Sequence, residues 1–268
     1  ENRETALAIF HEEHRTILEF VGKPWRVLSK QIKKTAERLS KIRLKKPYDD
    51  IPKISLVGEI YVRQDPISLQ NLIERMGDRG FIVRVSQTAE WIKYLDWLVK
   101  RRIEGAPNVG FWIRCLVKDH LDRKIRRALA PSGLINYETA HVEPVMEAGG
   151  RHVSPYLTGE AILTVGSALH EILHPACGII SIGPFGCMPT RVAESILNVR
   201  LNTEEKRAIE APNGHKGFGS ILAGNKKFPF LAIETDGRPF PQVIEARLET
   251  FCLQAQRLND EMLASRKS

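Results

Sequence analysis

The sequence predicts an α/β fold, namely a three-layer domain with a mostly parallel sheet of flavodoxin-like character and an N-terminal helical hairpin. Segments with apolar residues at helical spacing alternate with short apolar runs of strand length. The runs are Lys53 to Tyr61, with the strand ending near Gly58, and then Phe81 to Ser86, Gly178 to Pro184 and Phe228 to Ile233. Strands that alternate with helices form parallel sheets covered by helices on both faces.

Two amphipathic helices precede the first strand. They are expected over residues 3–21 and 24–44, with a break at Gly22 and Pro24. A polar, proline-containing stretch follows them. We therefore divide the chain into a helical hairpin or connector over residues 1–47 and an α/β domain over residues 48–268.

Further helices are expected wherever proline or glycine bounds a periodic segment. They cover 65–77, 88–130 with a break at 105–107, 159–174, the segment from Met188 onward, and 241–266. Residues 131–157 are rich in turn residues and give no clear element.

Composition places the chain among ordinary globular proteins. Its 268 residues are 43% hydrophobic and 27% charged, which suits one large domain or two small ones. No run approaches the ~20 apolar residues of a membrane helix, and no signal peptide begins the chain, so we expect a soluble, cytoplasmic protein without membrane contact. The four cysteines are far apart, which favours reduced thiols or metal ligands over disulfides.

The positive charge is concentrated near the N-terminus. The chain has a net charge of +8, yet residues 23–46 contain ten Lys and Arg and one acidic residue, Glu37. A basic helix of this kind is a candidate surface for an anionic partner. We do not expect this partner to be nucleic acid, because Trp25 is the one aromatic residue in the segment.

Cys187 has the most informative position among the cysteines. It follows the predicted third strand, after the turn Pro184-Phe185-Gly186, and Pro189 begins the next helix. Functional groups collect at the carboxyl ends of parallel strands, and the N-terminus of a helix favours a thiolate. Cys187 is thus a candidate metal ligand; the alternative is a small hydrophobic residue in a tight turn.

Three groups of residues resemble one protein family. The segment GEAILTVGSALHEILHPACGIISIGPFGCMPTRVAESIL, from Gly159 to Leu197, is similar to the region around the Pro-Phe-Gly-Cys-Met-Pro motif of 2-hydroxyacyl-CoA dehydratase components and CoA enzyme activase-related proteins. The strand from Val57 to Arg63, VGEIYVR, and the later segments from Pro229 to Gly237 and from Ala246 to Phe251 match in the same order. The resemblance covers about residues 53–265.

The resemblance implies an iron–sulfur protein. Relatives hold a [4Fe-4S] cluster through cysteines from separate segments, and the cluster receives an electron from an ATP-driven activator. Cys187 would be one ligand, and Glu59 and Arg63 would shape the neighbouring cofactor-binding cleft. A cluster needs about four ligands, so we expect this chain to be a C-terminal fragment, inactive and poorly loaded by itself. Its partners would be upstream domains of the same polypeptide and CoA-ester dehydratase components.

Other residues support competing hypotheses. The sequence His170-Glu171-Ile172-Leu173-His174 matches the H-E-x-x-H motif of zinc hydrolases, although Pro175 ends the helix at once. A non-catalytic scaffold that uses the basic helix is the second alternative. The glycine-rich loop over residues 213–227 lacks a complete phosphate-binding motif and is expected to be a surface loop. Arg247 and Glu249 are expected to form structural ion pairs.

Overall fold

The computed structural model describes residues 3–134, 142–174, 176–210 and 226–267. The chain forms two compact units. One consists of residues 1–49 and 104–140, and the other of residues 50–103 and 141–268. The predicted glycine-rich loop falls almost wholly on residues 211–225, which lie outside the described residues.

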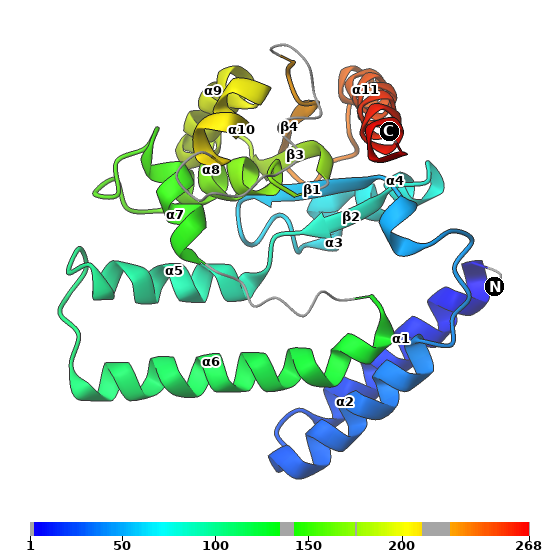
Figure 1. Cartoon of the computed structure of the whole chain (residues 1–268), viewed down its shortest axis with the longest axis vertical. Helices are drawn as coiled ribbons and strands as arrows, with labels where there is room; N and C mark the ends of the chain where they lie inside the picture. The colour runs from blue at the N-terminus through cyan, green and yellow to red at the C-terminus, as the bar shows by residue number, and fades with distance from the viewer. Residues whose placement is uncertain (1–2, 135–141, 175, 211–225, 268) are drawn as a thin grey trace. The chain divides into compact units, whose positions relative to one another are not determined.

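The first unit is all-helical. Helices α1 (Arg3–Phe20) and α2 (Trp25–Leu39) form the predicted hairpin, and α6 (Val109–Leu129) packs against α2 (Figure 1). The hairpin unit thus includes a helix that the sequence placed with the α/β domain. A short 3-10 turn, Ala130–Ser132, follows α6.

A buried carboxylate joins the two helices of the hairpin. Glu13 is 5% exposed; it accepts a hydrogen bond from the Thr35 hydroxyl and lies 2.8 Å from the Arg38 guanidinium. Arg38 also contacts Glu12 at 2.6 Å. Acidic residues of α1 therefore neutralise part of the basic charge of α2.

The second unit contains a parallel sheet of four strands, as predicted. The strands are β1 (Lys53–Gly58), β2 (Ile82–Val85), β3 (Ala176–Pro184) and β4 (Phe230–Thr235), in the order β2-β1-β3-β4. Every pair is parallel. After β1 the chain moves toward one edge of the sheet, and after β3 toward the other, so the direction of winding changes between these two central strands.

Helices cover both faces of the sheet, which gives the three layers (Figure 1). The helices α3 (Pro66–Leu69), α4 (Leu72–Asp78) and α11 (Gln242–Lys267) pack on the face of Ile54, Leu56, Ile180 and Ile182. The other face carries Val57 and Ile179 and is covered by α5 (Thr88–Lys100), α7 (Val142–Gly150), α8 (Glu160–Glu171) and α9 (Met188–Arg200). Helix α10 (Thr203–Glu210) follows α9, and the 3-10 turn Tyr48–Asp50 precedes β1.

Two glycines let side chains approach β3 from opposite faces. A Cβ at Gly178 would lie 2.7 Å from the ring of Phe251 on α11, and a Cβ at Gly183 would lie 2.3 Å from the Thr190 hydroxyl on α9. The central strand is therefore in direct contact with both helical layers.

The first strand ends at Gly58, as expected, because the chain turns sharply there. The limits of the element that follows differ from the prediction. The single helix expected over 65–77 is two helices, separated by Gln70 and Asn71 with φ of 48° and 55°. Burial of Leu69 and Leu72 on the two sides of this break explains why the chain accepts left-handed backbone there.

Helix α7 lies in the segment that gave no clear element from sequence. Pro144 and the pair Gly149-Gly150 are typical turn residues, yet Pro144 occupies the first turn of the helix, where its missing N–H is not needed. Packing against α8 buries Val145 and Met146 and compensates for the weak local preference for helix.

Among the helices of the described residues, none is both long and apolar enough to span a membrane.

The crossing of α7 and α8 provides a test of the fold. A Cβ at Gly149 would lie 2.3 Å from the carbonyl oxygen of Ile162, whereas a Cβ at Gly150 would meet no atom within 4 Å. We expect Gly149→Ala to lower the free energy of unfolding by about 1–3 kcal/mol through overpacking. Gly150→Ala should raise it by up to about 1 kcal/mol, because alanine is the better helix former. Urea denaturation measures both, and equal effects would contradict the crossing.

Candidate functional site

The carboxyl ends of β1 and β3 form the candidate site. Gly58 and Ile182 are paired in the register of the two strands, and the Glu59 amide donates a hydrogen bond to the Ile182 carbonyl at 2.9 Å. The turns that follow, residues 59–63 and 185–187, therefore begin at the same edge. In open α/β sheets, ligands bind where the winding direction changes. Glu59, Arg63 and Cys187 are thus all at the edge where the sequence placed them.

Gly58 allows the two strands to approach at this point. Its φ is +119°, and a Cβ would lie 2.0 Å from the Ile182 carbonyl oxygen. A side chain here would separate β1 from β3 or distort the turn. Glu59 then stabilises the turn, because its carboxylate accepts a hydrogen bond from the Val62 amide at 2.7 Å.

Arg63 is a buried cation beneath the β1 turn. It is 3% exposed, and its Nη1 donates to the Gly58 carbonyl at 2.8 Å. Its Nε and Nη2 have no hydrogen-bond partner among the described residues. Burial lowers the pKa of the guanidinium, while the charges of Glu90, Glu160 and Glu59 act in the opposite direction. Arg63 therefore supports the turn from inside, and two of its nitrogen atoms have no hydrogen-bond partner among the described residues.

A row of polar side chains runs along α8 toward this site. It consists of Glu160, Thr164, Ser167 and Glu171, which are spaced four, three and four residues apart and so lie on one face of the helix. We call it the α8 polar row. Its two ends touch β1 and the following turn: Glu160 accepts from the Ile60 amide at 3.2 Å, and Glu171 accepts from the Ser55 hydroxyl at 2.6 Å.

The contacts at the two ends of the row fix the direction of α8. Glu160, at the start of the helix, meets the turn that follows β1, and Glu171, at its end, meets Ser55 within the strand. The helix thus runs antiparallel to β1 and brings its polar face over the strand. The face of the sheet toward α8 is partly polar, whereas the opposite core is apolar.

Glu90 on α5 joins the middle of the α8 polar row. It is 8% exposed and accepts a hydrogen bond from the Ser167 hydroxyl at 2.6 Å. Burial raises the pKa of Glu90, although the Ser167 hydrogen bond and the charge of Arg63 lower it. Burial likewise raises the pKa of Glu160. The site therefore contains two carboxyl groups with raised affinity for a proton beside a buried cation.

Cys187 is the N-cap residue of α9. Its amide donates to the Pro184 carbonyl at 3.1 Å, and its side chain makes no capping hydrogen bond. Glu234 of β4 supports the turn, because its carboxylate lies 3.4 Å from the Gly186 amide and 3.2 Å from Arg191. Cys187 is partly exposed at the carboxyl edge.

The other three cysteines are buried. Cys177 lies at the opposite end of β3, where its thiol donates to the Lys53 carbonyl at 3.1 Å and burial raises its pKa to about 12. Burial also raises the pKa of Cys252 on α11. Cys115 belongs to the first unit. Within the described part of the chain, no three His, Cys, Asp or Glu residues are placed to hold a metal ion. Among the described residues the carboxyl edge thus carries one thiol, that of Cys187, whereas a [4Fe-4S] cluster needs about four ligands.

The H-E-x-x-H motif lies at the amino end of the sheet, away from this site. Helix α8 ends at Glu171, so His174 lies just beyond the helix, although the rings of His170 and His174 remain close, with centroids 4.8 Å apart. The carboxylate of Glu171 is already bound by the Ser55 hydroxyl and by Arg84 at 3.0 Å. These contacts do not favour the zinc-hydrolase hypothesis, in which this carboxylate would be the general base.

Sequence reasoning did not identify Glu90, Glu160 or Ser167 as site residues. Each lies in a helix whose apolar residues dominate the pattern, and a polar residue there is usually taken as solvent-exposed. The spacing of Glu160, Ser167 and Glu171 on one face of a segment that is otherwise almost wholly apolar could have indicated a buried polar row.

Comparisons with known proteins add no family assignment. No protein-family model, no curated protein and no solved structure was found to match this chain. The resemblance in the motifs therefore stands on the residues themselves.

The raised pKa of Glu90 predicts a pH-dependent effect on stability. When the pKa of a carboxyl group is higher in the folded state, the free energy of unfolding falls as the pH rises above the unfolded pKa, which is 4.5 for Glu90. The amide in Glu90→Gln remains neutral and avoids this loss. The free energy of unfolding of the variant, relative to wild type, should therefore increase between pH 4.5 and pH 7.5 in urea titrations.

The exposed Glu74 provides the control for this experiment. Glu74→Gln makes the same chemical change at an exposed position, and the effect of Glu90→Gln is measured relative to it. A pH-independent difference for Glu90→Gln would show that Glu90 does not titrate as its burial predicts.

The exposure of the cysteines predicts their reactivity. Because Cys187 is partly exposed and the other three are buried, a disulfide reagent should modify one thiol per native chain rapidly and all four after denaturation. Cys187→Ser should remove the rapid phase, and Cys252→Ser should leave it unchanged. A rapid phase that survives in Cys187→Ser would place the accessible thiol elsewhere.

Proposed function

We propose that this chain is the α/β part of an iron–sulfur protein related to 2-hydroxyacyl-CoA dehydratases and their activators. Cys187 supplies one thiolate to a [4Fe-4S] cluster that takes part in ATP-driven electron transfer. The observation that carries the proposal is the position of Cys187, a partly exposed N-cap thiol at the carboxyl edge of β3. The match to the Pro184–Pro189 motif falls on this turn.

The neighbouring turn supports a ligand site at the same edge. Glu59 is tied to the backbone of its own turn, and Arg63 fixes that turn from beneath. The proton-binding carboxyl groups Glu90 and Glu160 lie behind it. These residues give the edge a fixed shape and a mixed charge, and none of them is a sulfur ligand.

The remaining cluster ligands come from segments other than the described residues. Several large side chains on the segments that meet the carboxyl edge are mostly exposed, in keeping with a surface that another polypeptide segment covers: Tyr61 (71%), Tyr156 (80%), Phe185 (80%) and Met188 (63%). When bound, the cluster supplies one-electron chemistry. By itself the chain binds and orients one side of it and is not a complete enzyme.

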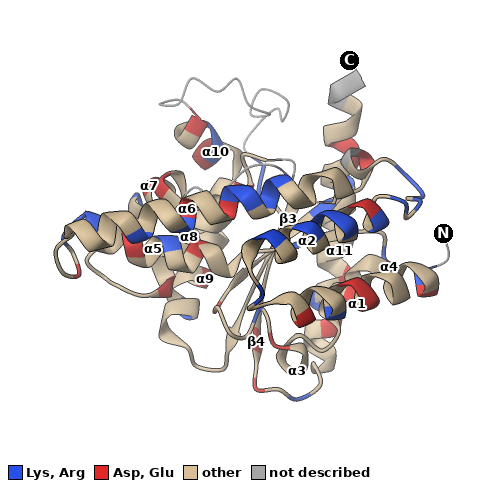
Figure 2. Cartoon of the chain, turned by 90° about the horizontal axis from the view of Figure 1, so that it is seen from below, with Lys and Arg blue, Asp and Glu red and all other residues tan. Residues whose placement is uncertain are grey.

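A second candidate function follows from the charge of the first unit. That unit has 18 Lys and Arg against 11 Asp and Glu, and nearly all of the net charge of +8 belongs to it. Figure 2 shows Lys and Arg along both α2 and α6. This charge favours a basic scaffold that binds an anionic partner. Part of it is neutralised by Glu12 and Glu13, so the iron–sulfur proposal comes first.

Anaerobic reconstitution tests the proposal. The full-length natural polypeptide that contains this chain is incubated with iron, sulfide and a thiol reductant, and its visible absorption and its iron and sulfide contents are measured. We expect a broad visible band and about four iron atoms per polypeptide. Cys187→Ser should lower both, because it removes one ligand, while the matched variant Cys252→Ser should retain them.

Other outcomes separate the alternatives. A colourless protein with one zinc ion that is lost in His170→Ala would replace the iron–sulfur proposal with the zinc hydrolase. A colourless protein without zinc that binds heparin with an affinity that falls steeply with salt, and that weakens when Lys30, Lys33 and Lys34 are replaced, would support the basic scaffold.

A further inference from the structure

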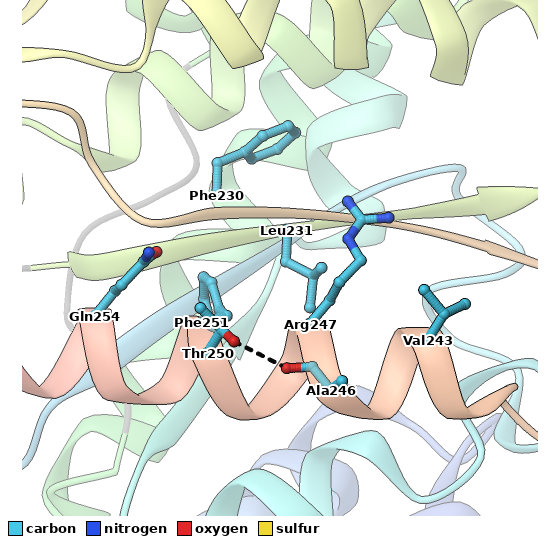
Figure 3. Close-up of a pocket in the computed structure, with 8 residues that line it drawn as sticks. All are labelled: Phe230, Leu231, Val243, Ala246, Arg247, Thr250, Phe251 and Gln254. Atoms are coloured by element: carbon cyan, nitrogen blue, oxygen red, sulfur yellow. Dashed lines mark hydrogen bonds between the residues drawn. The ribbon is translucent and has the colours of Figure 1, made fainter.

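A groove lies along the outer edge of the sheet, between β4 and α11. It encloses about 320 Å³ and is lined by residues of the strand and of the outward face of the helix: Phe230, Leu231, Val243, Ala246, Arg247, Thr250, Phe251 and Gln254 (Figure 3). None of these residues belongs to the candidate site at Cys187. The groove is therefore a separate surface that the proposed function does not use.

Strand β4 presents backbone groups at the sheet edge that have no partner among the described residues, although Lys226 and Phe228, just before the strand, pair with Thr203 and Leu201. Among the described residues it pairs with β3 alone. The carbonyls of Pro229 and Thr235 accept hydrogen bonds from the amides of Ile179 in β3 and of Phe185 just after it, at 3.0 Å and 3.1 Å. Because successive residues of a strand point their backbone groups to alternate sides, the N–H and C=O groups of Phe230, Ala232 and Glu234 point away from β3.

The edge lacks most of the usual protection against strand pairing. The sequence of β4, FLAIET, contains no proline and no lysine, and its register with β3 shows no bulge. Its one charged residue is Glu234. The carboxylate of Glu234 contacts Arg191 on α9 and the Gly186 amide in the turn after β3. A six-residue strand could therefore add to β4 without breaking any bond of the sheet.

Arg247 determines which strand fits. Its side chain extends from α11 to the level of β4 (Figure 3). The ion pair expected for it from the sequence does not form, since its guanidinium has no carboxylate within 4.0 Å in the described structure. A second copy of the chain paired through its own β4 would bring another Arg247 toward this one, whereas an acidic side chain on an added strand would neutralise it.

We propose that the groove is a binding site for an extended polypeptide segment that adds to the β4 edge as a fifth strand. The segment pairs with the backbone of Phe230, Ala232 and Glu234 and directs an acidic side chain to Arg247. Backbone pairing supplies the affinity, and Arg247 supplies the selectivity. Val243 and Thr250 line the groove on either side of Arg247 and contact the neighbouring side chains of the segment.

Fluorescence anisotropy with labelled hexapeptides tests this site. The probes are Val-Thr-Val-Glu-Val-Thr, the same peptide with Lys in place of Glu, and the Glu peptide with alternate backbone nitrogens methylated. The Glu peptide should bind more tightly than the Lys peptide, and the methylated peptide should not bind. Arg247→Glu should weaken the Glu peptide at least about fivefold and reverse the preference.

A variant of the strand tests the backbone pairing separately. Ala232→Pro removes an outward N–H and leaves the bonds to β3 intact, so the protein should fold and lose binding of the Glu peptide. Circular dichroism checks the fold, and Arg257→Glu, on an exposed part of α11 outside the groove, is the matched charge control that should bind as wild type does.

Three results of peptide binding, and one of sedimentation, would overturn the proposal. The first is equal binding of the methylated and unmethylated peptides. The second is tighter binding of both the Glu and the Lys peptide after Arg247→Glu, which would make Arg247 a guard of the edge. The third is no binding of any peptide at 1 mM peptide, on the order of the weakest affinities that such assays detect; a chain that sediments as a dimer until Ala232→Pro is introduced would assign the edge to a second copy instead. None of these experiments measures iron content, so they test the groove independently of the iron–sulfur proposal.

Discussion

The close contact between the backbones of β1 and β3 at Gly58 determines the geometry of the candidate site. Because no side chain separates Gly58 from Ile182, the end of β1 lies directly beside β3, which continues to Pro184, and the turns of both strands leave from the same edge. The β1 turn brings Glu59 and Arg63 to this edge, and the β3 turn brings Cys187. A larger residue at position 58 would displace one turn from the other, and the remaining features of the site would lose their common location.

The charged residues behind this contact impose a cost that the fold accepts. A guanidinium and two carboxyl groups in the interior lose hydration, and their mutual attraction and few hydrogen bonds recover only part of it. The α8 polar row lies between the sheet and a helix, where an apolar layer would be more stable. Buried polar groups of this kind are frequent at functional sites, and their position directly under the β1 turn agrees with that general rule.

The sequence was sufficient to predict the layers but not the interior of one of them. Strands such as β3 are almost wholly apolar, and glycine and proline mark the turn at Cys187, so the sheet and that turn could be predicted. Helix α7 could not, because its proline and glycines resemble a loop and its stability comes from packing on α8. Glu90 and Glu160 were missed for a related reason: whether a helical glutamate faces solvent or the core depends on which face the neighbouring helices cover. The location of α6 in the hairpin unit likewise depends on contacts between distant segments.

The two glycines of β3 have a mechanical consequence. Phe251 enters the strand from one face at Gly178, and Thr190 enters from the other at Gly183, each within the distance of ordinary contact only because a Cβ is missing. Neither α9 nor α11 can slide along the sheet without first withdrawing a side chain from its notch. Strand β3 therefore interlocks with the helical layer on each face. Displacement of α9, which begins after Cys187, is opposed by contacts through the whole thickness of the domain.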